Sequence, residues 1–121
     1  MLTKIRLELA RDAKHPDGAH NVGYEFGAPL DENGRIDAAE WHKRRENCRV
    51  RRFRPGEADD FGHLIRKPGG SWAFHYDIQS NEEDDESGYR FGDHVFKQGE
   101  YVSIREEEGL RTFRVVRVLP V

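Results

Sequence analysis

Alternation of apolar and polar side chains at every second residue is the feature that most restricts the fold of this chain. Within residues 3–9, Ile5, Leu7 and Leu9 share one parity, and charged residues stand between them. Successive side chains of a β-strand point to opposite faces, so this spacing predicts a strand with one buried face. Residues 71–78 repeat the pattern with aromatic side chains at alternate positions. The chain is therefore predicted to be built mainly of strands.

Turn-forming residues divide the rest of the chain into short extended segments. Pro presets φ and Gly tolerates positive φ, so stretches such as 15–18 and 68–70 are typical of turns. The acidic run 81–88 is predicted to be a solvated loop. Adjacent Val115 and Val116 indicate that the last strand carries a bulge or is covered on both faces. We predict about seven strands, drawn from the following ranges: 3–9, 22–28, 50–53, 62–67, 71–78, 89–96, 100–105 and 111–118.

One segment has the capping pattern of an α-helix instead. Asp37 is followed three residues later by Glu40, as in a capping box, and Ile36 and Trp41 have the spacing of a hydrophobic staple. We therefore predict one helix over about 37–48. The predicted fold class is mainly β (α+β), with an antiparallel sheet curled into a small barrel or sandwich and the helix packed on it.

Composition indicates one small domain, residues 1–121, with a thin core under a polar surface. Charged residues make up 36% of the chain, against about 25% in typical domains. Cys48 has no second cysteine with which to pair, which suits a reducing compartment, and its place on the apolar stripe of the helix predicts a raised thiol pKa. Neither a signal peptide nor a membrane-spanning stretch is expected. We expect a cytoplasmic protein with no membrane partner.

A family resemblance is carried by eight stretches of the chain: TKIRLELARDAKHPDG (3–18), GYEFGAPL (23–30), CRVRRF (48–53), GHLI (62–65), SWAFHYD (71–77), GYRFGDHVF (88–96), GEYVSI (99–104) and TFRVV (112–116). These stretches are spread along nearly the full length of the chain, and together they resemble a family of small uncharacterised proteins from alphaproteobacteria. The resemblance implies a bacterial, cytoplasmic origin. It implies no activity, cofactor or partner.

The leading functional hypothesis is a non-enzymatic binding or protein-interaction module. Aromatic residues make up 11% of a chain that is otherwise very polar, and no catalytic motif accompanies them. We predict that a barrel mouth or sheet face presents rings to a small ligand or a protein partner, without a cofactor. The alternative is that the same rings form the core. The candidate binding residues are Trp72, Phe74, Tyr76, Tyr89 and Phe91.

A second hypothesis is a metal-dependent or acid–base enzyme that uses histidines on strands. His75 and Asp77 lie two residues apart, and His63 and His94 lie on neighbouring predicted strands. Neutral imidazole together with carboxylate suits Zn²⁺ or another transition metal, and the same pair can orient a general base. The alternative is that these are solvent-facing polar residues, or that a histidine is satisfied by a neighbouring aspartate.

A third hypothesis is binding of nucleic acid, RNA in particular, through the basic segment 43–54. This segment has seven cations against one acid, and Trp41 and Phe53 flank it as stacking groups. The alternative is that the acidic runs 82–86 and 106–108 pair with these cations inside the fold. The candidate polyanion-binding residues are Arg44, Arg45, Arg49, Arg51, Arg52 and Arg54.

Overall fold

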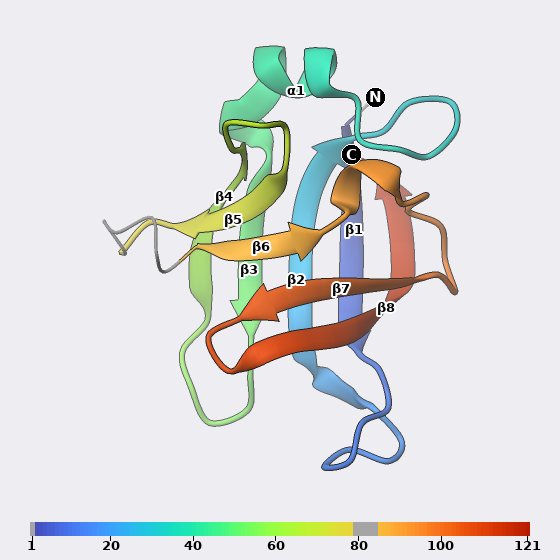
Figure 1. The fold of residues 1–121 in the computed structure, drawn as a ribbon, viewed down its shortest axis with the longest axis vertical. Helices are drawn as coiled ribbons and strands as arrows, with labels where there is room; N and C mark the ends of the chain where they lie inside the picture. Colours follow the sequence, from blue (N-terminus) through green and yellow to red (C-terminus); the bar gives the residue numbers. More distant parts are fainter. Residues whose placement is uncertain (1, 79–84) are drawn as a thin grey trace.

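The computed structural model describes residues 2–78 and 85–121, which form a closed antiparallel β-barrel with one short α-helix (Figure 1). Each strand pairs with the next along the chain, and the last strand pairs with the first. The predicted class is thereby confirmed as a barrel. The strands are β1 Leu2–Leu9, β2 Ala19–Pro29, β3 Arg49–Phe53, β4 Asp60–Arg66, β5 Trp72–Tyr76, β6 Glu86–Tyr89, β7 Tyr101–Glu106 and β8 Gly109–Pro120.

The seam between β1 and β8 contains the bulge that the valine pair indicates. Leu7 lies opposite Val115 whereas Arg6 lies opposite Arg117, so Val116 is the extra residue. Val115 then points into the core and is fully buried. The bulge lets β8 keep its apolar side chains inside although two valines are adjacent.

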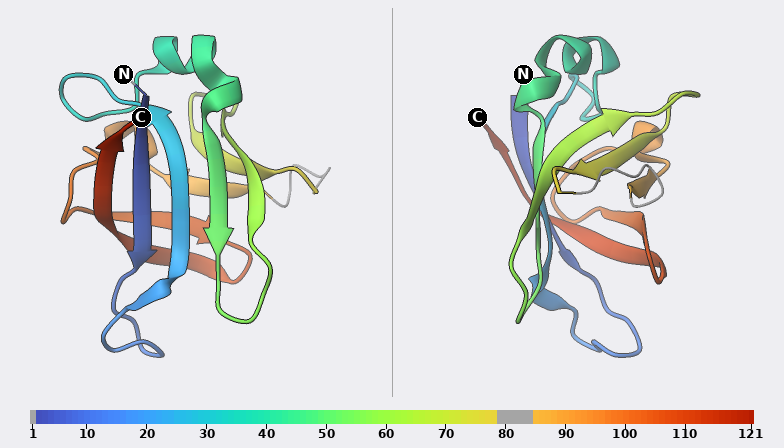
Figure 2. Two further views of the ribbon diagram at one scale, coloured as in Figure 1. Left: turned by 180° about the vertical axis from the view of Figure 1, so that it is seen from behind. Right: turned by 90° about the vertical axis from the view of Figure 1, so that its left-hand side faces the viewer.

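The helix α1, Ala38–Arg44, covers one end of the barrel (Figure 2). Asp37 is its N-cap, and a side-chain oxygen of Asp37 accepts a hydrogen bond from the backbone N–H of Glu40 at 3.1 Å. The helix is shorter than predicted, because the backbone leaves α geometry at Arg44 and continues as a 3₁₀ turn, η1, over Arg45–Asn47.

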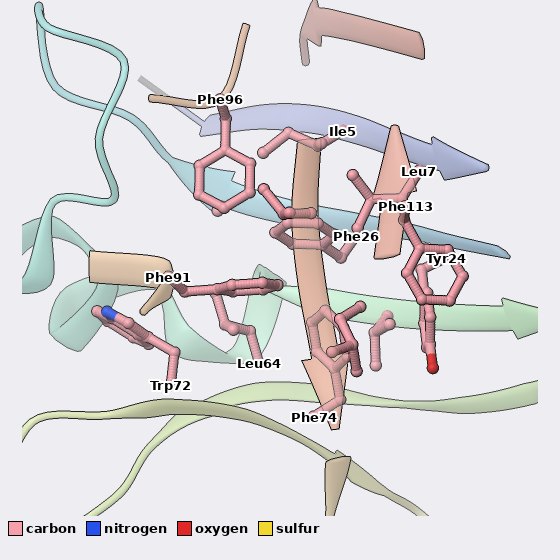
Figure 3. Close-up of a cluster of buried hydrophobic side chains, with 14 of the residues drawn as sticks. Ile5, Leu7, Tyr24, Phe26, Leu64, Trp72, Phe74, Phe91, Phe96 and Phe113 are labelled. Carbon is pink, nitrogen blue, oxygen red and sulfur yellow. The ribbon is translucent and has the colours of Figure 1, made fainter. Parts of the chain in front are cut away.

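Aromatic side chains fill the interior of the barrel (Figure 3). Phe26 packs against Phe74 at 5.1 Å and against Phe96 at 5.8 Å between ring centroids, and Tyr24 lies 5.3 Å from Phe74. Phe91 joins this group at 5.3 Å from Phe96. Edge-on and tilted ring contacts at 4.5–7 Å are favourable, so the middle of the barrel is a packed core.

The predicted strand over 89–96 is wrong. The strand β6 ends at Tyr89, and Arg90 adopts a left-handed conformation with φ 52° before the 3₁₀ turn η3, Phe91–Asp93. This reversal folds Phe91 back onto Gly88, where any Cβ would overlap the Phe91 ring. The spacing of Tyr89 and Phe91 at every second residue is the pattern expected of a strand. Phe91 nevertheless enters the core from η3, after the chain has turned at Arg90.

The predicted solvated loop over 81–88 is also wrong at its C-terminal end. Glu86 begins β6 and is buried, with Ser87 and Gly88 following it in the strand. The structure supplies partners for this carboxylate from other strands, as described below. The part of the predicted loop within 79–84 lies outside the described residues.

Candidate anion-binding groove

A groove of about 900 Å³ lies between α1 and the turn that joins β4 to β5. Figure 1 shows this turn directly beneath the helix. Its described lining consists of Ala38, Ala39, Trp41, His42, Arg45, Arg66, Lys67, Pro68, Gly69 and Gly70.

Both walls of the groove are held in place by specific contacts. The indole N–H of Trp41 donates to the carbonyl of Leu64 at 2.9 Å, and its ring packs edge-on against Trp72 at 5.2 Å. Across the groove, the N–H of Gly70 donates to the carbonyl of Lys67 at 2.9 Å. Gly70 has φ 92°, a value that glycine adopts without strain. The groove is therefore bounded by a pinned helix and a tight turn.

The charge of the lining is entirely positive. Arg45, Arg66 and Lys67 contribute three cations, and the described lining contains no Asp or Glu. Lys67 is partly compensated, because its Nζ lies 3.3 Å from a carboxylate oxygen of Asp85. Within residues 2–78 and 85–121, Arg45 and Arg66 form no ion pair. Arg66 instead lies 5.6 Å from the Trp72 ring centre. Two exposed guanidinium groups thus remain available to an anion.

A smaller hollow of about 290 Å³ adjoins the other side of the same turn, lined by Ile65, Arg66, Lys67, Pro68, His75 and Asp85. His75 Nδ1 lies 2.6 Å from a carboxylate oxygen of Asp85, whose side chain is almost completely buried. A buried carboxylate can orient an imidazole for general-base chemistry. However, this lining offers no Ser, Thr or Cys as a nucleophile.

A second polar cluster lies inside the barrel. The Tyr76 hydroxyl donates to Glu86 at 2.6 Å, and the Tyr24 hydroxyl lies against both Glu86, at 3.0 Å, and Glu106. Arg52 reaches the same two carboxylates at 2.7 Å and 3.4 Å. Figure 3 places Tyr24 at the end of the core away from Trp72. Each acidic group in this cluster therefore has a donor, as buried polar groups require.

Burial dominates the electrostatics of this cluster. It raises the pKa of Glu86, although the hydroxyl of Tyr76 and the guanidinium of Arg52 oppose that rise. It also raises the pKa of Tyr24. The side chains of Glu86 and Glu106 are only 7% and 6% exposed. Because a substrate has little access to them, we assign the cluster a structural role.

The structure separates the five predicted binding aromatics into two groups. Trp72, Phe74, Tyr76 and Phe91 are buried in the core, where they pack against other rings or the polar cluster. Tyr89 is 43% exposed on the outer surface of β6. The four buried rings match the core alternative, so only Tyr89 is placed to meet a ligand.

The structure does not gather the six predicted arginines on one surface. Five contact carboxylates: Arg44 with Glu40 (3.5 Å), Arg49 with Asp77 (3.1 Å), Arg51 with Glu25 (2.5 Å) and Asp59 (2.9 Å), Arg52 with Glu86 (2.7 Å), and Arg54 with Asp60 (2.6 Å). Arg52 contacts one residue of each acidic run, as the internal-pairing alternative expected. Of the six, Arg45 alone lines the groove.

Three of the four metal candidates do come together. His63 lies opposite His75 on β4 and β5, and His63 Nδ1 is 3.5 Å from Asp77. However, Arg49 places a guanidinium nitrogen 3.2 Å from His63 Nε2 and another 3.1 Å from Asp77, so a cation already occupies this position. His94 follows η3. Over the described part of the chain, no group of three or more His, Cys, Asp or Glu is placed to hold a metal ion.

The groove itself was not predicted from the sequence. Lys67, Gly69 and Gly70 were identified only as parts of a strand end and a turn, and Arg66 only as a strand residue. One signal was present, since Arg66 and Lys67 stand directly before the turn-forming sequence 68–70. The groove exists because α1 lies above these two cations and the β4–β5 turn.

Comparisons with protein-family models, with curated proteins and with solved structures find no match to this chain. The resemblance to an alphaproteobacterial family, and with it a bacterial and cytoplasmic origin, therefore stays a prediction. In the residues that the structure describes, no helix combines the length and the apolar character needed to cross a membrane.

Proposed function

We propose that the protein is a non-enzymatic binding module that holds an anionic ligand in the groove between α1 and the β4–β5 turn. The observation that carries this proposal is that Arg45 and Arg66 line the same groove, whose described lining residues include no acid. The whole chain has a formal net charge of −3. Cations that stand uncompensated on an acidic protein need an explanation, and a bound anion provides one.

The chemistry of the lining suits phosphate or carboxylate groups. Arginine presents a planar fork of donors that matches both groups, and charge-assisted hydrogen bonds of this kind are the strong ones. Trp41 and Pro68 add apolar surface beside the cations. Three cations along one open groove favour a ligand with several negative charges.

Isothermal titration calorimetry with linear polyphosphate, a polyanion without aromatic groups, tests this proposal. The variant Arg45→Glu/Arg66→Glu should lower the affinity by about tenfold or more, because a charge-assisted hydrogen bond contributes about 1.5–3 kcal/mol and 1.4 kcal/mol is a factor of ten. Affinity of the unmodified protein should fall as salt is added.

The matched control is Arg117→Glu. Arg117 is exposed on β8, which lies four strands from β4 in the ring of eight. Because Arg117→Glu changes the charge by half as much as the double variant, it is compared with Arg45→Glu and Arg66→Glu made singly. Each of these should weaken polyphosphate binding, whereas Arg117→Glu, at a distance from the groove, should leave the affinity nearly unchanged. Equal losses in the groove variant and this control, or no binding at low salt, would contradict the proposal.

A further inference from the structure

We infer that the anionic ligand is a single-stranded nucleic acid, whose phosphates occupy the groove while its bases stack on the outer face of β6 and β7. This inference rests on the proposed function, because it names the ligand of the same groove. It also adds a second surface, here called the tyrosine face and defined by Tyr89, Ser103, Tyr101, Thr112 and Arg114.

Two exposed rings make this face unusual on so polar a surface. Tyr89 is 43% exposed and Tyr101 is 56% exposed. Tyr89 lies opposite Ser103, and Tyr101 stands two residues before Ser103 on the same face of β7. Such diagonal neighbours are about 7–8 Å apart, within reach of long side chains. Two exposed rings on adjacent strands resemble the stacking platforms with which proteins bind unpaired bases.

Cations and hydroxyls border these rings. The Arg90 guanidinium lies 5.2 Å from the Tyr89 ring centre, and Arg114 is paired with Tyr101 across β7 and β8. Neither arginine forms an ion pair with another described residue. The Ser103 and Thr112 hydroxyls form a hydrogen bond with each other at 3.2 Å, so one of the two keeps its proton for a base edge and both keep an acceptor lone pair. The face thus combines stacking groups with free donors.

Acidic residues at the rim decide which part of the ligand lies where. Glu100 precedes Tyr101, and Glu107 and Glu108 form the turn between β7 and β8. These three carboxylates offset the positive charge of Arg90 and Arg114, so the tyrosine face as a whole attracts phosphates only weakly and leaves uncharged bases unaffected. The groove, whose described lining has cations and no acid, suits the phosphates. Charge therefore separates the two halves of the ligand between the two surfaces.

The groove and the tyrosine face are close enough for one strand to reach both. Arg66 pairs with Trp72, and Trp72 pairs with Gly88, the residue before Tyr89. Two inter-strand steps of 4.7–4.9 Å separate the backbone of Arg66 from that of Gly88, so the Cα atoms of Arg66 and Tyr89 lie about 10 Å apart. Arg66 shares the inner face of Trp72 and Gly88, whereas Tyr89 lies on the outer face, so the ligand would cross the rim of the barrel between them. Figure 1 shows β5, β6 and β7 on the same side of the barrel as the β4–β5 turn.

Fluorescence anisotropy with labelled oligo-dT and oligo-U tests the inference, with polyphosphate and polyglutamate as polyanions that lack bases. Tyr89→Ala and Tyr101→Ala should each lower oligonucleotide affinity at least about fivefold, which is about 1 kcal/mol and the low end for one stacked base. Polyphosphate affinity should not change. Tyr89→Phe/Tyr101→Phe should retain oligonucleotide binding, because the rings remain.

Phe61→Ala is the matched control, since Phe61 is 50% exposed on β4 outside the tyrosine face and its loss should not matter. Oligonucleotide binding that survives both alanine variants, or tighter binding of polyglutamate than of either oligonucleotide, would overturn the inference and leave the anion groove intact. Tyrosine-dependent oligonucleotide binding without any effect of Arg45→Glu/Arg66→Glu would instead refute the groove and leave the tyrosine face.

Discussion

Replacement of Arg52 by methionine should destabilise the barrel more than replacement of the neighbouring arginine. Arg52 is 17% exposed and contacts Glu86 at 2.7 Å and Glu106 at 3.4 Å. Methionine keeps most of the apolar stem but removes the guanidinium. Two carboxylates would then share the interior with tyrosine hydroxyls as their remaining described partners, apart from Arg111 beside Glu106.

The expected loss is about 3–5 kcal/mol, the usual cost of removing one partner from a buried ion pair. That cost arises because Glu86 is left with neither water nor a counterion, whereas Glu106 keeps Arg111. A domain of this size is stable by about 5–15 kcal/mol. The variant should therefore fold, with much of its stability lost.

Urea unfolding followed by tryptophan fluorescence measures this loss, because Trp41 and Trp72 are buried. With a slope of about 2 kcal/mol/M, the midpoint should fall by about 1.5–2.5 M. Arg51→Met is the control. Arg51 stands next in the chain but pairs with Glu25 and Asp59 on the outer face, and it is 34% exposed. Its loss should cost about 0–1 kcal/mol, as is usual for exposed pairs.

The difference in unfolding free energy between the Arg52→Met and Arg51→Met variants should also depend on pH, which provides a second check. Burial holds the pKa of Glu86 above its ordinary value of 4.5. The folded state therefore binds more protons than the unfolded state, so this group costs stability as pH rises from about 4.5 through the raised pKa. Without Arg52 this cost grows at neutral pH and disappears when the carboxylate is protonated. Equal midpoints for the two arginine variants at neutral pH would refute the assigned role of the cluster.

Two further predictions concern positions where burial is decisive. Gly88→Ala should lower stability by about 1–3 kcal/mol in the same urea assay, since the added methyl overlaps the Phe91 ring and the core is forced to shift. An unchanged midpoint would contradict the close packing of Phe91 against Gly88. Burial raises the pKa of the Cys48 thiol to about 11, so iodoacetamide should modify native protein at pH 8 far more slowly than urea-unfolded protein, and equal rates would show that the thiol is exposed.

Local patterns predicted the elements whose geometry depends on neighbours in the chain. The alternation of Ile5, Leu7 and Leu9 identified β1, and all three side chains are buried. Asp37 caps α1 as its spacing from Glu40 indicated. These features are predictable because strand parity and helix capping involve residues within a few positions of one another.

Features that depend on distant partners were not predictable in this way. The run of arginines indicated one basic surface, but alternation along β3 sends Arg51 outward to Glu25 and Arg52 inward to Glu86. Glu86 itself belonged to an acidic run typical of a loop. Only the closed pairing of strands shows that its carboxylate meets Arg52 and Tyr24 inside the barrel.

The groove has the same origin. Arg45 lies after α1, and Arg66 lies before the β4–β5 turn, so the two are brought together only when Trp41 bonds to the backbone of Leu64. Sequence spacing carries no record of that contact. The charge of each residue was visible in the sequence, but the placement of both beside described residues that include no acid was not.

An NMR titration of the ¹⁵N-labelled protein with oligo-dT tests most directly whether binding occurs on the outside of a filled barrel. The account predicts chemical-shift changes at the amides of Arg45, Gly69 and Gly70 and at Tyr89 and Tyr101, with residues of the packed core such as Phe74 unaffected. Changes centred on the core, or spread over β1 and β2 with none in the groove, would contradict it.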